Sequence, residues 1–297
     1  RDSIWDVFTK VPGAVINGED GEIACDHYHL YQDDVALMAS LGLQTYRFST
    51  SWSRVRPDGG ALNPKGVDFY KRLVDELLQA GILPWLTLYH WDLPQALQDR
   101  GGWTRRETAD RFTEYALDMH DALGDRVDVW TTLNEPWCSS FLGYTAGLHA
   151  PGHYSRSEGM LAAHHLLLAH GQTVRALRAR DSSLDLGITL NLTVADPADP
   201  AEPADIDAAR RIDGQFNRWF LDPIFRGKYP QDIFDEIAEK DDLGRAAPTA
   251  RIVFRYPVEQ HIEQIETAVN VADRINPPTF GYGGRSAGPS QFQKAFQ

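Results

Sequence analysis

A carboxylate follows directly on a short apolar run near the middle of the chain. Residues 127–132 are rich in β-branched and aromatic side chains and predict a buried strand, after which come Asn134, Glu135, Pro136 and Trp137. An apolar wall of indole rings favours the protonated form of a carboxyl group, so Glu135 could deliver a proton to a glycosidic oxygen. The alternative is that Glu135 only caps a loop or pairs with an arginine.

A second pair of residues suited to binding a sugar follows the apolar run at 86–89. His90 and Trp91 follow that run and offer a hydrogen-bonding imidazole beside an apolar platform. Sugars require both, because their hydroxyl groups need polar partners while their C–H faces stack on aromatic rings. The alternative is that Trp91 fills the core and that His90 has a structural hydrogen bond.

Apolar runs and helical patterns alternate along most of the chain. Strands are predicted at 45–49, 82–89, 127–132 and 186–192, and amphipathic helices at 30–41, 64–80, 104–123, 155–180 and 206–220. Three of the helices have start signals, namely Asn63 before Pro64, Thr104 with Glu107, and Ser155 with Glu158. Such alternation implies a parallel sheet with helices outside it.

This pattern indicates the α/β class and, if the sheet closes into a ring, a (β/α)8 TIM barrel. The chemistry of such barrels lies at the carboxyl ends of the strands. Arg47, His90 and Glu135 all fall at predicted strand ends, which favours a functional role for them. Only four strands can be counted, so the barrel is expected to be incomplete in this chain.

The chain is expected to divide near residue 248. Residues 1–248 hold the partial barrel. Residues 249–297 are expected to form a divergent C-terminal tail, with a helix at about 257–275 followed by a poorly ordered stretch rich in Gly, Pro, Ser and Gln.

The composition argues against binding to nucleic acid or to a membrane. The formal net charge is −13 and the pI is about 5.2, so phosphate groups would be repelled. No apolar run reaches membrane-spanning length, and the first residues do not resemble a signal peptide, so a cytoplasmic protein is expected, although the chain does not begin with Met. Cys25 and Cys138 lie far apart and are expected to be reduced thiols.

No cofactor or metal site is predicted. No Gly-rich phosphate loop follows a predicted strand, which argues against a dinucleotide-dependent oxidoreductase. His165 and His170 are five residues apart on one predicted helix, so they do not share a face and do not indicate a metal site.

Five segments, in their order and spacing, closely resemble glycoside hydrolase family 1, the family of the β-glucosidases and their relatives. They are Ser3-Ile4-Trp5-Asp6, Ala24-Cys25-Asp26-His27-Tyr28, Tyr46-Arg47-Phe48-Ser49 through Trp52-Ser53-Arg54, Tyr89-His90-Trp91-Asp92-Leu93-Pro94, and Thr132-Leu133-Asn134-Glu135-Pro136-Trp137. The resemblance implies a retaining β-glycosidase that hydrolyses terminal β-linked glucose, or a related sugar, from aryl glycosides or from cellobiose-like oligosaccharides, as in cellulose degradation. The implied partner is a small carbohydrate, and the oligomeric state is left open.

The resemblance also implies roles for residues at the strand ends. Glu135 matches the acid/base that protonates the departing oxygen and then deprotonates the attacking water. Asn134 matches the residue that hydrogen-bonds the sugar 2-hydroxyl. His90 and Trp91 match groups that hold other hydroxyls of the ring, and Trp137 is expected to line the leaving-group side.

Only one of the two carboxylates of such an enzyme is found in these motifs. Arg47 matches the arginine whose positive charge keeps the nucleophile ionised, but the Glu-Asn-Gly motif that would carry the nucleophile does not occur in the sequence. The family's first strand is expected upstream of Arg1. Because a retaining glycosidase needs two carboxylates about 5–5.5 Å apart, the alternative is an inert or sugar-binding-only fragment.

Overall fold

Four parallel strands form the sheet of the computed structural model, which describes residues 2–238. Their order is β1 (Thr45–Ser49), β2 (Leu83–Tyr89), β3 (Val129–Asn134) and β4 (Asp185–Thr189), so neighbours in the sequence are neighbours in the sheet. All four predicted strands are confirmed, although β3 extends to Asn134 and β4 ends at Thr189 rather than at 192. The predicted boundary at 248, the helix at about 257–275 and the tail to 297 lie outside the described residues.

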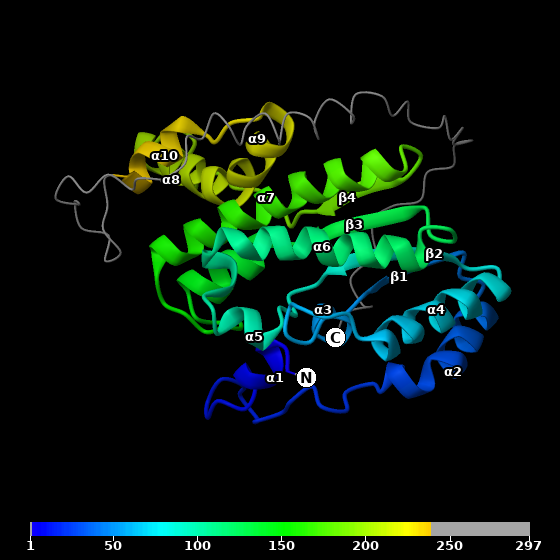
Figure 1. Ribbon diagram of the computed structural model, residues 1–297. Coiled ribbons are helices and arrows are strands. Elements are labelled where there is room, and N and C mark those ends of the chain that lie inside the picture. Colours follow the sequence, from blue (N-terminus) through cyan, green and yellow to red (C-terminus); the bar gives the residue numbers. More distant parts are fainter. Residues whose placement is uncertain (1, 239–297) are drawn as a thin grey trace.

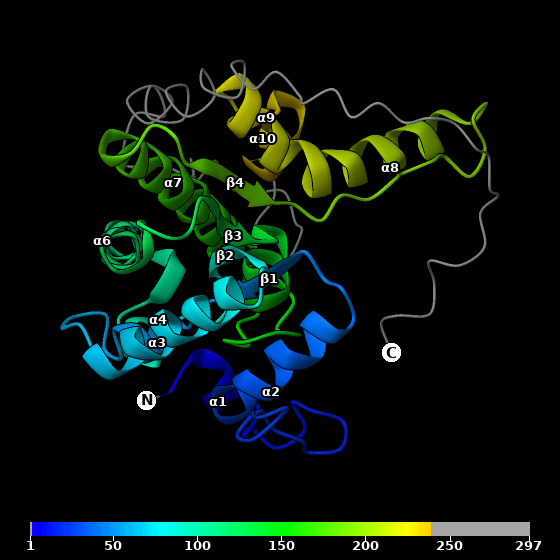
Figure 2. The same ribbon diagram turned by 90° about the vertical axis from the view of Figure 1, so that its right-hand side faces the viewer.

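Long helices return the chain from the end of one strand to the start of the next. Helix α2 (His27–Ser40) precedes β1, α4 (Pro64–Gln79) joins β1 to β2, α6 (Arg106–Leu123) joins β2 to β3, and α7 (Arg156–Arg180) joins β3 to β4. Figures 1 and 2 show α4, α6 and α7 along one face of the sheet. This repeat of parallel strands with helices outside is that of a (β/α)8 barrel, and the described part contains four of its strands.

The main core lies between the sheet and these helices. Removal of its apolar side chains from water supplies most of the free energy that holds the helices on the strands. Fully buried members include Leu86, Leu88 and Trp130 from the strands, and Leu73, Leu77, Phe112, Met119 and Leu177 from the helices. Helix α2 contributes less, since Leu30 and Leu37, in the predicted apolar stripe, are exposed and Val35 is its buried residue. No helix within residues 2–238 is long and apolar enough to cross a membrane.

Short helical turns follow the carboxyl ends of the strands. They are α3 (Trp52–Val55) after β1, α5 (Gln95–Gln98) and the 3-10 turn η1 (Gly102–Thr104) after β2, and the π-helical turn η2 (Cys138–Thr145) after β3. Helix α1 (Ile4–Phe8) is attached to the segment after β2, because the backbone N–H of Ile4 donates to the carbonyl of Leu93 at 2.8 Å. These turns determine where the residues at the strand ends lie.

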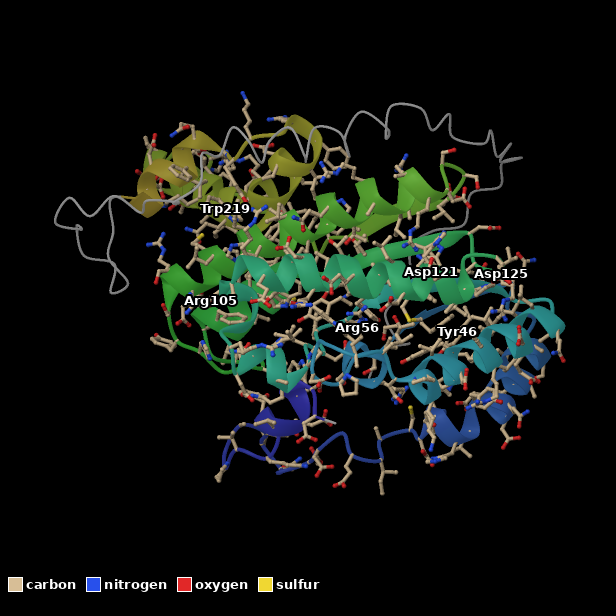
Figure 3. All side chains as sticks on the ribbon, in the orientation of Figure 1. Tyr46, Arg56, Arg105, Asp121, Asp125 and Trp219 are labelled. Carbon is tan, nitrogen blue, oxygen red and sulfur yellow. The ribbon has the colours of Figure 1, made fainter. Side chains whose placement is uncertain are left out.

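The helix predicted at 206–220 is confirmed, within a longer continuous helical run whose middle turn is π-helical. Helix α8 (Pro203–Asp213) ends in the π-helical turn η3 (Gly214–Arg218), which leads into α9 (Trp219–Arg226) and then α10 (Gln231–Ala238). The side chain of Asn217 accepts from the N–H of Thr193 at 3.0 Å and donates to its carbonyl at 2.7 Å, which ties η3 to the segment after β4. Trp219 packs beside this turn in a second apolar cluster (Figure 3).

Of the three predicted helix starts, the one at Ser155 is confirmed and the capping box at Thr104 is wrong. The hydroxyl of Ser155 accepts from the backbone N–H of Glu158 at 3.4 Å. Thr104 instead ends the turn η1 and donates to the carbonyl of Gly101 at 2.6 Å, so α6 begins only at Arg106. The 3-10 turn therefore uses the hydroxyl that the pattern assigned to a cap.

The start of α4 is correctly placed at Pro64, but Asn63 acts differently from a capping residue. Its side chain makes no hydrogen bond to the first turn of the helix, and its Nδ2 donates to the carbonyl of Arg54 at 2.8 Å. Asn63 therefore joins α3 to α4.

A buried tyrosine of α6 holds the ends of β1 and β2. The hydroxyl of Tyr115 lies 2.5 Å from the Oγ1 of Thr50 and donates to the carbonyl of Leu88 at 3.0 Å. Its ring stacks on Trp52 with centroids 5.4 Å apart. Because these backbone positions immediately precede the turns after the strands, Tyr115 stabilises the platform on which the strand-end residues stand.

We predict that Tyr115→Phe lowers the free energy of unfolding by about 1–2 kcal/mol, because buried polar groups of Thr50 and Leu88 lose a partner. Urea-induced unfolding followed by far-UV circular dichroism measures the change. Tyr154→Phe is the matched control, since that side chain is 86% exposed, and it should change the free energy little. Equal effects of the two substitutions would contradict the assignment.

Candidate active site

Arg47 of β1 reaches across β2 to the end of β3. Its Nε donates to the Oγ1 of Thr87 at 2.9 Å, and its Nη2 donates to the Oδ1 of Asn134 at 2.8 Å. The guanidinium also lies over the ring of Trp85, 5.7 Å from the centroid. Because arginine only donates hydrogen bonds, the atom of Asn134 that faces it is the carbonyl oxygen. The amide nitrogen of Asn134 has no acceptor among residues 2–238 and is available to a ligand.

A β-bulge directs Asn134 toward Arg47. Thr131 pairs with Gly187 and Asn134 with Thr189, so β3 has one more residue than β4 over this stretch. Strict alternation would put Asn134 on the face of Thr132, whose hydroxyl lies 2.8 Å from His170 of α7. The extra residue instead brings Asn134 to the face of Arg47. Bulges next to functional sites commonly re-aim a side chain in this way.

Glu135 follows with a left-handed backbone, at φ +46°. Its N–H donates to the carbonyl of Thr189 at 2.9 Å, and its own carbonyl accepts from the N–H of Cys138 at 2.9 Å. This conformation costs a non-glycine residue about 1–2 kcal/mol, which these bonds and the packing around them must offset. The half-buried carboxyl group accepts from the thiol of Cys138, with Sγ and Oε2 3.6 Å apart.

The charges of three predicted site residues act on one another. Burial lowers the pKa of His90, the positive charge of Arg47 lowers it further, and the negative charge of Glu135 opposes both. Burial also lowers the pKa of Arg47, again opposed by Glu135. His90 is therefore neutral at pH 7, able to donate from one ring nitrogen and accept at the other. Arg47 lies in the middle of β1 rather than at its end as predicted, but its side chain reaches Asn134 at the end of β3. Arg47, His90 and Glu135 thus form one electrostatic group.

Trp91 lies beside this group and is also left-handed, at φ +79°. Its Nε1 donates to the backbone carbonyl of Asn134 at 2.9 Å. Trp5 of α1 stacks on it with ring centroids 6.3 Å apart, and the ring of His149 lies 5.2 Å away. Since its N–H is donated within the protein, the side chain of Trp91 in this arrangement has no further hydrogen bond to donate.

Trp137 is positioned by an aromatic partner that the sequence did not indicate. Its ring stacks on Phe216 of η3, with centroids 3.9 Å apart and planes 27° from parallel. Phe141 lies 5.9 Å away on the same π-helical turn as Cys138. Trp137 thus contacts the segment after β4 as well as the one after β3.

A cavity of about 570 Å³ lies between β1 and α2, and Arg47, Thr87 and His90 line one side of it while Asp34, Leu37 and Met38 of α2 line the other. The predicted site residues Trp91, Asn134, Glu135 and Trp137 do not line it. Another cavity of about 590 Å³ lies beside α1 and α5, and none of the predicted site residues lines it.

Two of the three histidines of α7, His165 and His170, are buried and serve the core. His170 contacts Thr132, and His165 lies 2.8 Å from the carbonyl of Trp103. Burial lowers the pKa of His170 to about 4, so it is neutral at pH 7. The part of the chain described by the structure contains no group of three His, Cys, Asp or Glu side chains arranged to hold a metal ion.

Four residues of the site were not predicted from the sequence: Thr87, Cys138, Asn191 and Phe216. Thr87 could have been predicted as a neighbour of Arg47. The parallel register of β1 and β2 pairs Thr87 with Ser49, which is two residues after Arg47 and on the same face of the sheet. Cys138 lies three residues after Glu135, which would place it on the same side of a helical turn. No comparable local signal indicates Asn191 or Phe216. The path of the chain after β4 places Asn191 beside the sulfur of Cys138 and Phe216 against Trp137.

The fold and the site define a (β/α)8-barrel protein with polar groups gathered at the carboxyl ends of its strands. Residues 1–270 match the profile described as Glycosyl hydrolase family 1. The chain is 52% identical over 242 residues to the "Thermostable beta-glucosidase B" of Thermobispora bispora, covering 81% of this chain and 50% of that protein. The chain belongs to glycosyl hydrolase family 1.

Solved structures agree with this assignment. The psychrophilic β-glucosidase BglU of Micrococcus antarcticus superposes with a TM-score of 0.81 at 52% identity, covering 89% of this chain and 54% of that one. The virulence factor SghA of Agrobacterium tumefaciens, in complex with its substrate analog salicin, gives a TM-score of 0.80 at 39% identity, covering 89% of this chain and 56% of that one. The predicted barrel fold is confirmed. The chain spans about half the length of the curated relatives it matches.

We predict opposite shifts in the titration of His90 when its two charged neighbours are neutralised. Glu135→Gln should lower the pKa of His90 further, because the opposing negative charge is lost, and Arg47→Met should raise it, because the positive charge is lost. Heteronuclear NMR of the imidazole, assigned with His90→Gln, measures both.

His170 is the internal control for this titration, since burial and the charge of Arg178 lower its pKa. Its midpoint should stay constant in both variants. Shifts of His90 in the same direction in the two variants would contradict the geometry of the group.

Proposed function

We propose that the protein is a retaining β-glycosidase of the β-glucosidase type. The observation that carries the proposal is the arrangement at the end of β3. There the amide of Asn134, oriented by Arg47, lies next to Glu135. The charges of Arg47 and Glu135 both act on the pKa of His90. A neutral polyhydroxylated ligand needs directed donors and acceptors without a surplus of charge, and this group supplies them.

Glu135 is the proposed acid/base. In the first step its carboxyl proton passes to the glycosidic oxygen as the bond from this oxygen to the anomeric carbon breaks, the nucleophile, a second carboxylate, bonds to that carbon, and the aglycone leaves as an alcohol. In the second step the same carboxylate takes a proton from water, whose oxygen bonds to the anomeric carbon and releases the sugar from the nucleophile. One half-buried carboxyl group held between two strand ends can serve both steps, because its position is fixed by backbone bonds to Thr189 and Cys138.

Asn134 is the proposed partner of the sugar 2-hydroxyl. The bond from Arg47 uses its carbonyl oxygen, so its amide nitrogen is free to donate. A hydrogen bond to this hydroxyl strengthens as positive charge develops on the ring in the transition state. His90, neutral and exposed beside the cavity, is proposed to hold another hydroxyl, and Trp91 to present its ring.

Arg47 is proposed to stand beside the nucleophile. Within residues 2–238 it forms no ion pair with a carboxylate, and its bonds to Thr87 and Asn134 fix it at the strand ends. A carboxylate next to this guanidinium stays ionised and can form the covalent glycosyl intermediate, about 5–5.5 Å from the acid/base. The whole protein therefore needs a second carboxylate at this place for retaining hydrolysis.

The proposed substrates are small β-glucosides, both aryl glycosides and cellobiose-like disaccharides. The relatives named above as β-glucosidases, and the complex of SghA with salicin, support this class. The stacked rings of Trp137 and Phe216 offer a flat apolar surface suited to the leaving group, whether an aryl ring or the C–H face of a second sugar.

We predict that Glu135→Gln separates substrates by their leaving groups. Cleavage of cellobiose, whose leaving alcohol needs a proton, should slow by roughly 10²–10⁴-fold, whereas formation of the glycosyl intermediate from dinitrophenyl β-glucoside should be nearly unchanged. Burst and steady-state kinetics on the full-length protein measure the two.

Glu107→Gln is the control for this experiment, since that glutamate is exposed on α6, and it should leave both rates unchanged. Equal loss on both substrates in Glu135→Gln would contradict the acid role. Binding of glucose without turnover of dinitrophenyl β-glucoside by the wild-type protein would favour the sugar-binding-only alternative.

A further inference from the structure

The thiol of Cys138 lies between Glu135 and Asn191. Its sulfur is 3.6 Å from the Oε2 of Glu135 and 3.6 Å from the Nδ2 of Asn191, both normal separations for hydrogen bonds to sulfur. The cysteine is only 7% exposed and begins the π-helical turn after β3. Asn191 comes two residues after β4, so this contact joins the ends of two neighbouring strands at the carboxyl group.

The donor and the acceptor of both hydrogen bonds of Cys138 are determined by the chemistry of the groups. The amide of Asn191 donates to the sulfur, and the sulfur donates its hydrogen to Oε2. A thiolate could not donate, but burial and the adjacent charge of Glu135 raise the pKa of Cys138 to about 12, so the thiol keeps its hydrogen. The donor is therefore present throughout the pH range in which a glycosidase works.

We propose that Cys138 is a positioning residue for Glu135, whose Oε2 it holds so that the transferable proton resides on Oε1. This inference rests on the proposed function. A carboxyl group that must give a proton in one step and take one in the next is best served when only one of its oxygens exchanges protons. The contact with Cys138 occupies the other oxygen in both steps.

A thiol suits this task better than a hydroxyl group. Sulfur is a weak donor, so it orients the carboxylate without stabilising the anion strongly. A serine at the same place would donate more strongly and favour the ionised form, which opposes the acid step. Among the described residues, the charges of Arg47 from β1 and His90 from β2 also act on Glu135, and neither side chain is hydrogen-bonded to its oxygens.

The first experiment tests the contact without any need for turnover. In a Cys25→Ser background, which removes the other thiol, the S–H stretching band of Cys138 is recorded by infrared spectroscopy as the difference from Cys138→Ala, with and without Glu135→Gln, because a buried thiol is poorly reached by reagents. An amide oxygen is a weaker acceptor than a carboxylate, so the band should move to higher wavenumber in Glu135→Gln. Glu158→Gln, which removes the carboxylate paired with His153, is the control and should leave the band unchanged. Equal band positions with and without Glu135→Gln would overturn the proposal.

The second experiment compares Cys138→Ala with Cys138→Ser in the full-length protein. The two side chains are similar in size but only serine donates, so a role in packing alone predicts the same behaviour for both. We expect the two variants to differ, with the basic limb of the kcat/KM profile on cellobiose at lower pH in Cys138→Ser than in Cys138→Ala, because only serine donates to Oε2. Coincident limbs in the two variants would overturn the proposal. Complete absence of hydrolysis by the wild type would refute the proposed function, and the S–H band would then still decide whether Cys138 contacts Glu135.

Discussion

The hydrogen bond from Arg47 to Asn134 is the constraint on which the site depends. It spans β2 to join β1 to β3, and it requires both the parallel order of the strands and the bulge that turns Asn134 toward the guanidinium. A donor-only partner on the carbonyl oxygen determines the orientation of the amide, and this in turn decides which atom can meet a ligand. Glu135 follows Asn134 directly, so its position depends on the same bulge. The geometry of the acid is thus a consequence of how the sheet is built.

The elements of the fold were predictable where periodicity is strong and local. The strands at 45–49 and 82–89 and the helix beginning after Ser155 agree with the structure, because alternating apolar residues and a side-chain cap act within a few residues. The prediction failed where tertiary contacts compete with local preference. Thr104 has a hydroxyl suited to a cap but donates it to the carbonyl of Gly101. The helix at 206–220 is present, but it widens to a π-helical turn at Gly214–Arg218, where Asn217 binds the backbone of Thr193, and this turn was not predicted.

The residue types of the site were also predictable, whereas their relations were not. Glu135, His90 and Arg47 could be chosen because each is a polar side chain within or directly after a predicted strand, and the active sites of (β/α)8 barrels lie at the carboxyl ends of the strands. The bulge could not be foreseen, since it is a mismatch between β3 and β4 rather than a property of either strand. The same holds for Asn191 and its contact with Cys138, which arise from the path of the chain after β4. Resemblance to the family assigns roles to positions, but only the structure relates them by hydrogen bonds.

The two left-handed residues show how this site is held. Trp91 and Glu135 each follow a strand end in a conformation that non-glycine residues avoid, and each is linked to Asn134, one through its indole N–H and the other through the peptide bond. If each conformation costs about 1–2 kcal/mol, the packing of Trp5 on Trp91 and the bonds from Glu135 to β4 must offset it. Relaxing either residue would release strain but would also turn its side chain away from the group. Stability and the placement of the acid are therefore opposed at these two positions, and the contacts around them, Cys138 included, serve to hold the strained arrangement.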